Sequence, residues 1–568
     1  MKFSGAKLFL PIALLFLLAE CRAQIVPFPY TIDKESTGDS VMVVTAHPLA
    51  TKTGIEILRK GGNAVDAAIA VQFALAVVYP QAGNIGGGGF MIFRGKEGKT
   101  DALDFREKAP AAAKENMYLD SAGNVLANKS RLGGLACGVP GTVDGMWAAH
   151  KKYSLLTWGE LVTPAIELAA KGYQITEQEA QNLNEERFTF VRHSSIQPAF
   201  VKMEPWQAGD WLIQKDLAQT LARIAGYGRD GFYTGGTASL IVSEVSKQGG
   251  LMTMQDLQDY HSVWRPALEF DYKDLHIITM PPPSSGGIIL RQLLAMTGEY
   301  PLKDQGFHSA AAVHLMAEAE RRAYADRAVH MGDPDFWKVP VKTLTDAAYL
   351  KSRMADFQAD KATKSAAISA GQIKESEETT HYCIVDVAGN AVSVTTTLND
   401  SYGSRVVVSG GGFILNNEMD DFSAKPGAPN MYGAIGGKAN AVAPGKRPLS
   451  SMTPVIVAKA GKPWMVVGTP GGTTIPTSVF QVIVNVAEFG MTLPDAVQSK
   501  RFHHQWRPDK IFIEEGAFTE EVIQKLSAMG HIVEPRDPIG RVEAILRLPN
   551  GLWQGVADER GDDAAQGY

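Results

Sequence analysis

The sequence has little cysteine and no excess of basic charge. Its 568 residues include three cysteines, and 55 Lys and Arg residues stand against 61 Asp and Glu residues, for a formal net charge of −6. So few cysteines exclude a disulfide framework, and this charge balance excludes the basic surface that nucleic-acid binding requires. An apolar content of 45% with 20% charged residues is typical of a globular protein.

Long apolar runs are also lacking, except near the N-terminus. Lys2 and Lys7 precede an apolar run from Leu8 to Ala19, which is too short for a transmembrane helix. The pattern is typical of a secretory signal removed after Ala23, so residues 1–23 are predicted to be a signal peptide. No later run is long enough to be a transmembrane segment.

The signal and the shortage of cysteine together predict a periplasmic or secreted bacterial protein. An alternative is a lipoprotein anchor at Cys21, although Glu20 fits a lipoprotein box poorly. If Cys21 leaves with the signal, Cys137 and Cys383 remain, and each is expected to be a small buried apolar residue.

The apolar pattern predicts a long domain without a linker. Asn63 is a good N-cap for an alanine-rich helix, and in this part of the chain we expect strands or helices at 41–44, 50–59, 64–78 and 90–93. The run from Gly83 to Gly89 lies between a helix and a strand, which reverses the order of a dinucleotide-binding loop and indicates close backbone packing. Residues 155–350 are expected to be mainly helical scaffold.

A threonine that opens a strand is the most informative feature. The acidic stretch Lys374–Glu378 leads into Thr379, and the residues up to Leu398 predict a hairpin closed by Val387-Ala388-Gly389, with Thr379 opposite Thr397. A cut before Thr379 would give its hydroxyl an α-amine base with a pKa of roughly 7.7–8.0. From spacing alone, two ordinary β-branched strand residues are the simpler interpretation.

Strands with helices segregated around them favour an α+β fold. A further strand at 464–467 ends at a glycine pair and is followed by a helix at about 476–488. With an N-terminal nucleophile candidate, this arrangement predicts a four-layer αββα sandwich, in which two stacked antiparallel sheets lie between helical layers. One such core could include most of the chain.

Several polar groups could bind a charged small molecule. Arg106 follows a strand and could clamp a carboxylate in a bidentate fork. Separately, the adjacent hydroxyls of Ser450 and Ser451 are neutral donors that could hold a carboxylate without a buried charge. Gly471 and Gly472 could present two backbone N–H groups to an oxyanion. From the sequence alone, a surface ion pair is the simpler interpretation of Arg106, and such a glycine pair is more often an ordinary turn. Turn chemistry explains the two serines equally well.

Two further clusters contain groups of the kind that bind ligands. The acidic and amide side chains of Asn416–Asp421 could bind an ammonium group or cap a loop. His503 and His504 are adjacent, so their side chains point in different directions, and no cysteine or carboxylate has ligand spacing to them. No metal site is predicted.

Together these segments resemble the γ-glutamyltranspeptidase family of N-terminal nucleophile hydrolases. The resemblance covers nearly the whole chain after the signal, and its motifs, in family order, are GGNAVDAAIA, PQAGNIGGGGF, LDFREKAP, TTHY, TLN, LNNEMDDF, RPLSSM, TPGG and RFHHQW. It implies a proenzyme that cuts itself between Glu378 and Thr379. The large subunit, 24–378, and the small catalytic subunit, 379–568, would stay associated as a heterodimer in one αββα body.

The resemblance also implies a role for each candidate residue. Thr379 is the expected nucleophile, Thr397 would orient it, and the oxyanion hole would be formed by Gly471 and Gly472. The α-carboxylate of the donor would be held by Arg106, Ser450 and Ser451. The α-ammonium group would be held by Asn399, Glu418 and Asp421, and Tyr432 would be the residue of a lid loop.

The implied activity is that of a γ-glutamyltransferase and glutathione hydrolase that needs no cofactor. Thr379 would take the γ-glutamyl group from glutathione or a related compound and transfer it to water or to an acceptor amino acid or dipeptide. One alternative is an acylase of the same fold acting on glutaryl or cephalosporin amides, although such substrates lack an α-ammonium group. Another is an uncut, non-catalytic scaffold relative.

Overall fold

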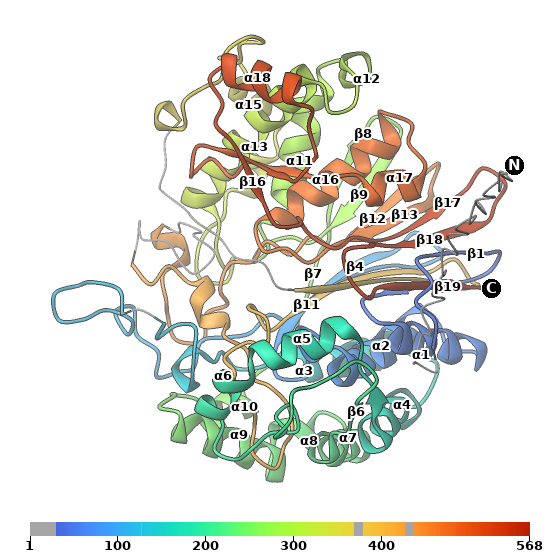
Figure 1. Ribbon diagram of the computed structural model, residues 1–568, viewed down its shortest axis with the longest axis vertical. Helices are drawn as coiled ribbons and strands as arrows, with labels where there is room; N and C mark the ends of the chain where they lie inside the picture. Colours follow the sequence, from blue (N-terminus) through green and yellow to red (C-terminus); the bar gives the residue numbers. More distant parts are fainter. Residues whose placement is uncertain (1–29, 127, 369–378, 426–436) are drawn as a thin grey trace, which may run out of the picture.

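Two seven-stranded antiparallel sheets lie face to face between layers of helices (Figure 1). The computed structural model describes residues 30–126, 128–368, 379–425 and 437–568. This architecture confirms the predicted four-layer αββα sandwich. The predicted signal peptide with Cys21, the residue Glu378 and the lid residue Tyr432 lie outside the described residues.

Strands from distant parts of the chain alternate in both sheets. In order, the first sheet consists of β1 (Glu35–Gly38), β18 (Trp553–Ala557), β17 (Glu543–Arg547), β13 (Lys462–Gly468), β12 (Val455–Lys459), β9 (Leu275–Thr279) and β8 (Leu268–Tyr272). The second sheet consists of β19 (Ala564–Gly567), β2 (Met42–Thr45), β10 (Thr380–Val385), β11 (Ala391–Thr397), β3 (Gly88–Arg94), β4 (Thr100–Asp104) and β7 (Val263–Arg265).

Each sheet carries helices on its outer face (Figure 1). The helical layer beside the second sheet includes α1 (Pro48–Arg59), α2 (Ala64–Val78), α3 (Thr142–Tyr153), α4 (Trp158–Lys171), α7 (Lys215–Tyr227) and α9 (Gly235–Lys247). The layer beside the first sheet includes α11 (Gly286–Gly298), α13 (Ala310–His330), α16 (Thr474–Ala487), α17 (Leu493–Gln498) and α18 (Glu520–Ala528).

Strand β10 shows how the core is divided between the layers. Tyr382 and Ile384 belong to the apolar cluster between the second sheet and its helices, and Tyr382 Oη donates to the carbonyl oxygen of Ala68 in α2. Cys383 and Val385 point the other way, into the cluster between the two sheets. This alternation is the two-residue period of a strand that is buried on both faces.

The hairpin predicted from the sequence is present. Thr380 pairs with Thr396, a register that places Thr379 opposite Thr397, and Gly389 adopts the positive φ of 87° that the turn requires. Helix α2 has the predicted bounds, and the side chain of Asn63 caps it by accepting from the N–H groups of Val65 and Asp66. Both remaining cysteines, Cys137 and Cys383, are buried thiols, as expected.

The prediction for residues 155–350 was incomplete. Most of this stretch is helical, but β7, β8 and β9 also arise from it and complete one edge of each sheet. The edge strands β7 and β8 are only partly buried, so they lack the strong apolar alternation that marks an internal strand. No described helix has both the length and the apolar character needed to cross a bilayer.

The glycine-rich run before β3 permits close backbone contact, as predicted. A Cβ atom on Gly87 would lie 2.1 Å from the carbonyl oxygen of Thr397 and 2.8 Å from Oδ1 of Asn84. Any larger residue here must therefore displace either the loop or the end of β11.

We predict that Gly87→Ala destabilises the protein by about 1–3 kcal/mol, because an overpacked backbone contact has to shift. Thermal unfolding followed by circular dichroism would measure the loss as a lower melting temperature. The matched control is Gly159→Ala in α4, where an added Cβ meets nothing within 4 Å. Equal melting temperatures for the two variants would contradict the packing argument.

Candidate active site

Thr379 lies at the end of the second sheet, one residue before β10, and is 5% exposed. Its neighbour across the hairpin, Thr397, is the last residue of β11, and Thr397 Oγ1 accepts a hydrogen bond of 2.8 Å from the N–H of Asn399. Asn399 has a φ of 79°, in the left-handed region that asparagine tolerates better than most residues. The chain thus turns sharply immediately after the threonine pair.

Most of the residues singled out in the sequence line one cavity. This donor cavity has a volume of about 30 Å³, and its walls include Arg106, Arg327, Thr379, Thr397, Asn399, Glu418, Asp421, Ser450, Ser451 and Gly472. The segments that supply these residues are far apart in the sequence. The fold therefore brings together the candidate nucleophile and both candidate groups of charged residues.

Oppositely charged side chains contact each other directly in the donor cavity. Arg106 Nη1 lies 2.5 Å from Glu418 Oε2, and Arg106 Nη2 donates to Asp421 Oδ2. Glu107 Oε2 lies 3.5 Å from the same guanidinium, and both of its oxygens are buried without a hydrogen-bond partner. Three carboxylates thus surround Arg106 in a space from which water is largely excluded.

The close packing of these charges changes their protonation equilibria. Burial raises the pKa of Glu418 well above its usual range, although Arg106 opposes the shift, and burial also raises the pKa of Asp421. Burial raises the pKa of Glu107 to about 8. For Arg106, burial alone would lower the pKa, but the negative charges of Glu418 and Asp421 raise it. The site has an excess of carboxylates that an added cation would stabilise in their charged form.

Hydroxyl groups and a second guanidinium form the opposite part of the donor cavity. Arg327 Nη2 donates to Ser451 Oγ at 3.1 Å, and Arg327 Nε donates to Ser285 Oγ at the same distance. Ser285 also fixes the backbone of Ser450, which precedes Ser451 in this wall. Its N–H and its Oγ both donate to the carbonyl oxygen of Ser450 at 2.7 Å.

Arg327 was missed in the sequence. It lies near the end of α13, among charged residues that resemble an exposed helix surface, yet Glu318, Glu320, Arg321, Arg322, Asp326 and Arg327 are all buried. Only the packing of α13 against α11 and α18 shows that these charges face the interior. The dense run of charges in the sequence was the one signal that could have pointed to Arg327, but such a run usually indicates a helix face exposed to solvent.

The glycine pair adopts a conformation suited to close backbone approach. Gly471 and Gly472 have φ values of 135° and 53°, and within the described part of the chain neither N–H donates a hydrogen bond. The N–H of Thr474, the first residue of α16, donates to the carbonyl oxygen of Gly471 at 2.9 Å. Gly472 lines the donor cavity, whereas Gly471 lines a neighbouring cavity that also contains Thr379.

The adjacent histidines have separate structural partners, as their positions suggested. His503 Nδ1 lies 2.8 Å from Thr477 Oγ1 and its Nε2 lies 2.6 Å from Gln505 Oε1. His504 Nε2 lies 3.5 Å from Asp509 Oδ1. Burial lowers the pKa of His503 to about 3 and that of His504 to about 4, so both rings are neutral at physiological pH.

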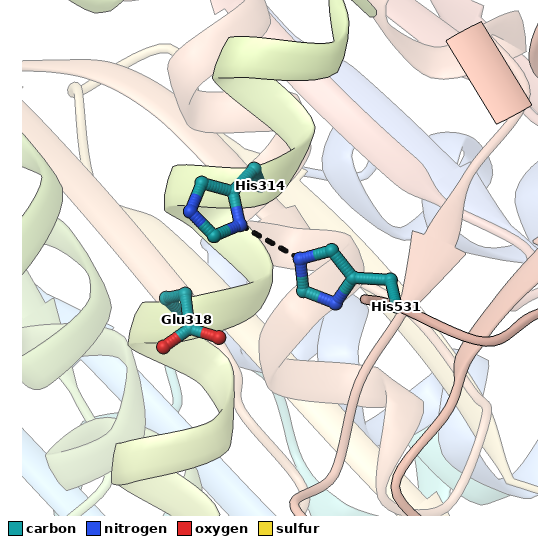
Figure 2. Close-up of side chains that lie close together, drawn as sticks. All are labelled: His314, Glu318 and His531. Carbon is teal, nitrogen blue, oxygen red and sulfur yellow. Dashed lines mark hydrogen bonds between the residues drawn. The ribbon is translucent and has the colours of Figure 1, made fainter. Parts of the chain in front are cut away.

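Among the described residues, one other group brings ligand-type atoms close together, namely His314, Glu318 and His531 (Figure 2). His314 Nδ1 lies 2.7 Å from His531 Nε2, which is the spacing of a hydrogen bond between the rings. Glu318 accepts from Arg321 Nε at 3.2 Å and from Arg322 Nη1 at 2.6 Å. These arginines already neutralise the carboxylate and would repel a metal cation, so the group fits a structural hydrogen-bond network better.

This chain is similar to proteins of known family. The family model Gamma-glutamyltranspeptidase matches residues 50–568. The chain is 46% identical over 532 residues to the glutathione hydrolase proenzyme of Escherichia coli (strain K12), a match that covers 93% of this chain and 92% of the relative.

Solved structures are similar as well. A chain of γ-glutamyltranspeptidase from Helicobacter pylori is 46% identical, with a TM-score of 0.56, and the match covers 57% of this chain and 94% of that chain. Cephalosporin acylase from Bacillus halodurans is 25% identical, with a TM-score of 0.82, and the match covers 96% of this chain and 98% of that chain. From the family model and the extent of the sequence match, the protein belongs to the γ-glutamyltranspeptidase family.

Proposed function

We propose that this protein is a proenzyme that cuts itself before Thr379 and then acts as a γ-glutamyltransferase and glutathione hydrolase. One observation supports this most strongly: Thr379 shares a cavity with the guanidinium of Arg106 and the carboxylates of Glu418 and Asp421. The name of the Escherichia coli relative, a glutathione hydrolase proenzyme, supports both the cut and the substrate.

The cut needs only groups of this chain. Thr379 Oγ attacks the carbonyl carbon of the preceding residue, its proton moves to the Thr379 nitrogen, and the peptide C–N bond breaks to leave an ester. Water then opens the ester and releases Thr379 with a free α-amine. In the mature enzyme this amine is the general base for the hydroxyl, while Thr397 orients the hydroxyl.

After the cut, the products 24–378 and 379–568 stay together as a heterodimer, because their strands alternate in both sheets. In the second sheet, β10 pairs with β2, β11 pairs with β3 and β19 pairs with β2. In the first sheet, β12 pairs with β9 and β18 pairs with β1. The match with the Helicobacter pylori chain covers 94% of that chain but only 57% of this one. A chain that is one product of such a cut is expected to match in this way.

The charges in the donor cavity suit the amino-acid head of a γ-glutamyl group. Its α-carboxylate takes the place of the acidic partners of Arg106 and also accepts from Ser450 and Ser451. Its α-ammonium group donates to Glu418 and Asp421, which otherwise share one guanidinium, and to the side-chain oxygen of Asn399. The N–H groups of Gly471 and Gly472 then stabilise the oxyanion formed when Thr379 attacks the γ-carbonyl carbon. Tyr432 is proposed as the lid residue.

The same fold in cephalosporin acylase makes an acylase the second candidate. A glutaryl substrate carries a carboxylate but no α-ammonium group. Burying the Glu418 and Asp421 carboxylates beside such a substrate would leave their charge without a cationic partner from the ligand. We therefore favour the γ-glutamyl substrate.

We also propose that the protein is exported, with residues 1–23 removed as a signal peptide and the mature enzyme in the periplasm or outside the cell. Lys2 and Lys7 before a short apolar run support this proposal. Analysis of the mature N-terminus tests it directly. A first residue of Gln24 is expected, whereas a lipid-modified Cys21 would indicate the anchored alternative.

We predict that the purified wild-type protein consists of two fragments that meet at Glu378 and Thr379, and that Thr379→Ala remains one chain. Intact-mass spectrometry of both proteins measures this, and Thr380→Ala is the matched control one residue away. A single chain in the wild type, or a cut in Thr379→Ala, would contradict self-cleavage by this residue. An uncut wild type would support a scaffold protein instead.

A second prediction concerns Asp421. Asp421→Asn removes one negative charge at the proposed ammonium site, so KM for γ-glutamyl-p-nitroanilide is expected to rise about tenfold or more. KM for glutaryl-p-nitroanilide, which has no ammonium group, should change much less. Glu418→Gln keeps an acceptor in place and is expected to have the smaller effect of the two. Equal changes for both substrates in Asp421→Asn would contradict the proposed ammonium site.

A further inference from the structure

A large cavity lies at the end of the two sheets that is opposite to Thr379. It has a volume of about 350 Å³, and its lining includes residues 386–389 of the turn between β10 and β11 and residues 461–463, where β13 begins. We refer to it as the turn cavity. Strand β10 connects it to Thr379 over a distance of about 20 Å, at about 3.3 Å per residue. The turn cavity shares no lining residue with the donor cavity.

Basic side chains outnumber acidic ones in the lining of the turn cavity. Four are basic and two are acidic, namely Arg94, Lys96, Lys462, Arg547, Asp39 and Asp386. The carboxylate of Asp386 is already used locally, because it accepts from the N–H groups of Ala64 and Ala388 at 2.9 and 3.0 Å. The chain as a whole has a formal net charge of −6, so this local excess of positive charge runs against its overall balance. Such a cavity attracts an anion.

Arg94, the last residue of β3, is a buried cation without an acidic partner. Its side chain is 5% exposed, and Nη1 and Nη2 donate to the carbonyl oxygens of Gly95 at 3.4 Å and Gly461 at 2.5 Å. No carboxylate of the described chain forms an ion pair with it. Burial lowers the pKa of Arg94, although the more distant charge of Glu269 opposes the shift. An anion in the turn cavity would supply the counter-charge that this guanidinium lacks.

Arg547, the last residue of β17, is a second cation with no ionic partner. Its guanidinium lies over the ring of Trp553, 4.7 Å from the centroid, and Trp553 is itself buried. The ring orients the guanidinium by a cation–π contact. In the part of the chain that the structure describes, Arg547 forms neither a hydrogen bond nor an ion pair, so its N–H groups can bind a ligand. Lys462 is exposed at the rim of the same cavity.

We propose that the turn cavity binds a small organic phosphate, and that Arg94 and Arg547 hold the phosphate group. The planar guanidinium matches the oxygens of a phosphate in a bidentate fork. A phosphate monoester carries a charge of about −1.5 to −2 near neutral pH, which balances two arginines better than the single charge of a carboxylate does.

The size of the turn cavity supports an organic ligand. Its volume of about 350 Å³ lies within the range of about 300–1,000 Å³ typical of small-molecule sites. The lining also contains the apolar side chains of Val387, Ala388 and Pro463, which can pack against the carbon atoms of the ligand. This site is separate from the donor cavity, and its occupancy does not depend on the reaction proposed at Thr379.

The test measures binding of glycerol 3-phosphate to the full-length protein by isothermal titration calorimetry. In Arg547→Gln, Kd is expected to rise about tenfold or more, because a charge-assisted contact is lost. The matched control is Arg507→Gln, since Arg507 also lies over a tryptophan, 4.8 Å from the ring centroid of Trp506, but outside the turn cavity. Its Kd should equal that of the wild type.

Two further variants test the remaining cations. Arg94→Gln should raise Kd about as much as Arg547→Gln, and Lys462→Glu, which reverses an exposed charge, should raise it about two- to fivefold. If the arginine variants do not fold, Lys462→Glu decides, because its side chain is exposed and no described carboxylate pairs with it. Equal Kd values in the wild type, Lys462→Glu and the arginine variants that fold would overturn the inference.

Two other ligands test the chemical class. Glycerate has a similar carbon skeleton but a single negative charge, and it is expected to bind about fivefold more weakly or worse, as one fewer charge-assisted contact implies. Inorganic phosphate lacks the carbon atoms and is also expected to bind more weakly. Glycerate that binds as tightly would overturn the assignment of a phosphate, and inorganic phosphate that binds as tightly would overturn that of an organic ligand. A wild type that shows no saturable binding of glycerol 3-phosphate overturns the inference outright.

Discussion

The pairing of β10 between β2 and β11 is the constraint on which the site depends. Strand β10 is buried along its whole length, with one face against α2 and the other against the first sheet. Because both edges and both faces are occupied, the strand cannot slide without moving its entire set of side chains to the wrong layer. Thr379, one residue before this strand, is held at the end of the second sheet by the same contacts.

Buried charge is the second organising feature. Arg106, Glu418 and Asp421 form ion pairs in a cavity of about 30 Å³, so the charged groups fill most of the space that a substrate would need. Removing such charges from water is costly unless each has a partner. In the proposed function, the carboxylate of a zwitterionic ligand would bind the arginine and its ammonium group would bind the two acids, which otherwise share that one guanidinium.

The glycines give the backbone access to this small site. A side chain at Gly87 would collide with the end of β11, and Gly471 and Gly472, one in the lining of each of the two cavities that contain Thr379, adopt positive φ values. The backbone can therefore lie close to Thr379, which lines both cavities. Larger residues would force strand, loop and helix apart at the point where Thr379 lies.

The residues of the site were largely predictable, but their mutual contacts were not. Local patterns predicted the hairpin register that sets Thr379 opposite Thr397, the cap of α2 and the αββα class, because turns, caps and apolar periods depend on neighbouring residues. The roles given to Arg106, Glu418, Asp421, Ser450 and Ser451 came from family resemblance. The structure adds that the arginine and the acids contact one another.

What the sequence by itself determined is the set of local elements and the one threonine that follows an acidic stretch and opens a strand. Only the tertiary structure decided that Arg327 faces the donor cavity, that β7, β8 and β9 complete the sheets, and that a neighbouring cavity also contains Thr379. These features arise from contacts between segments far apart in the chain. Their residues carry no local periodicity that distinguishes a buried charge or an edge strand from an exposed one.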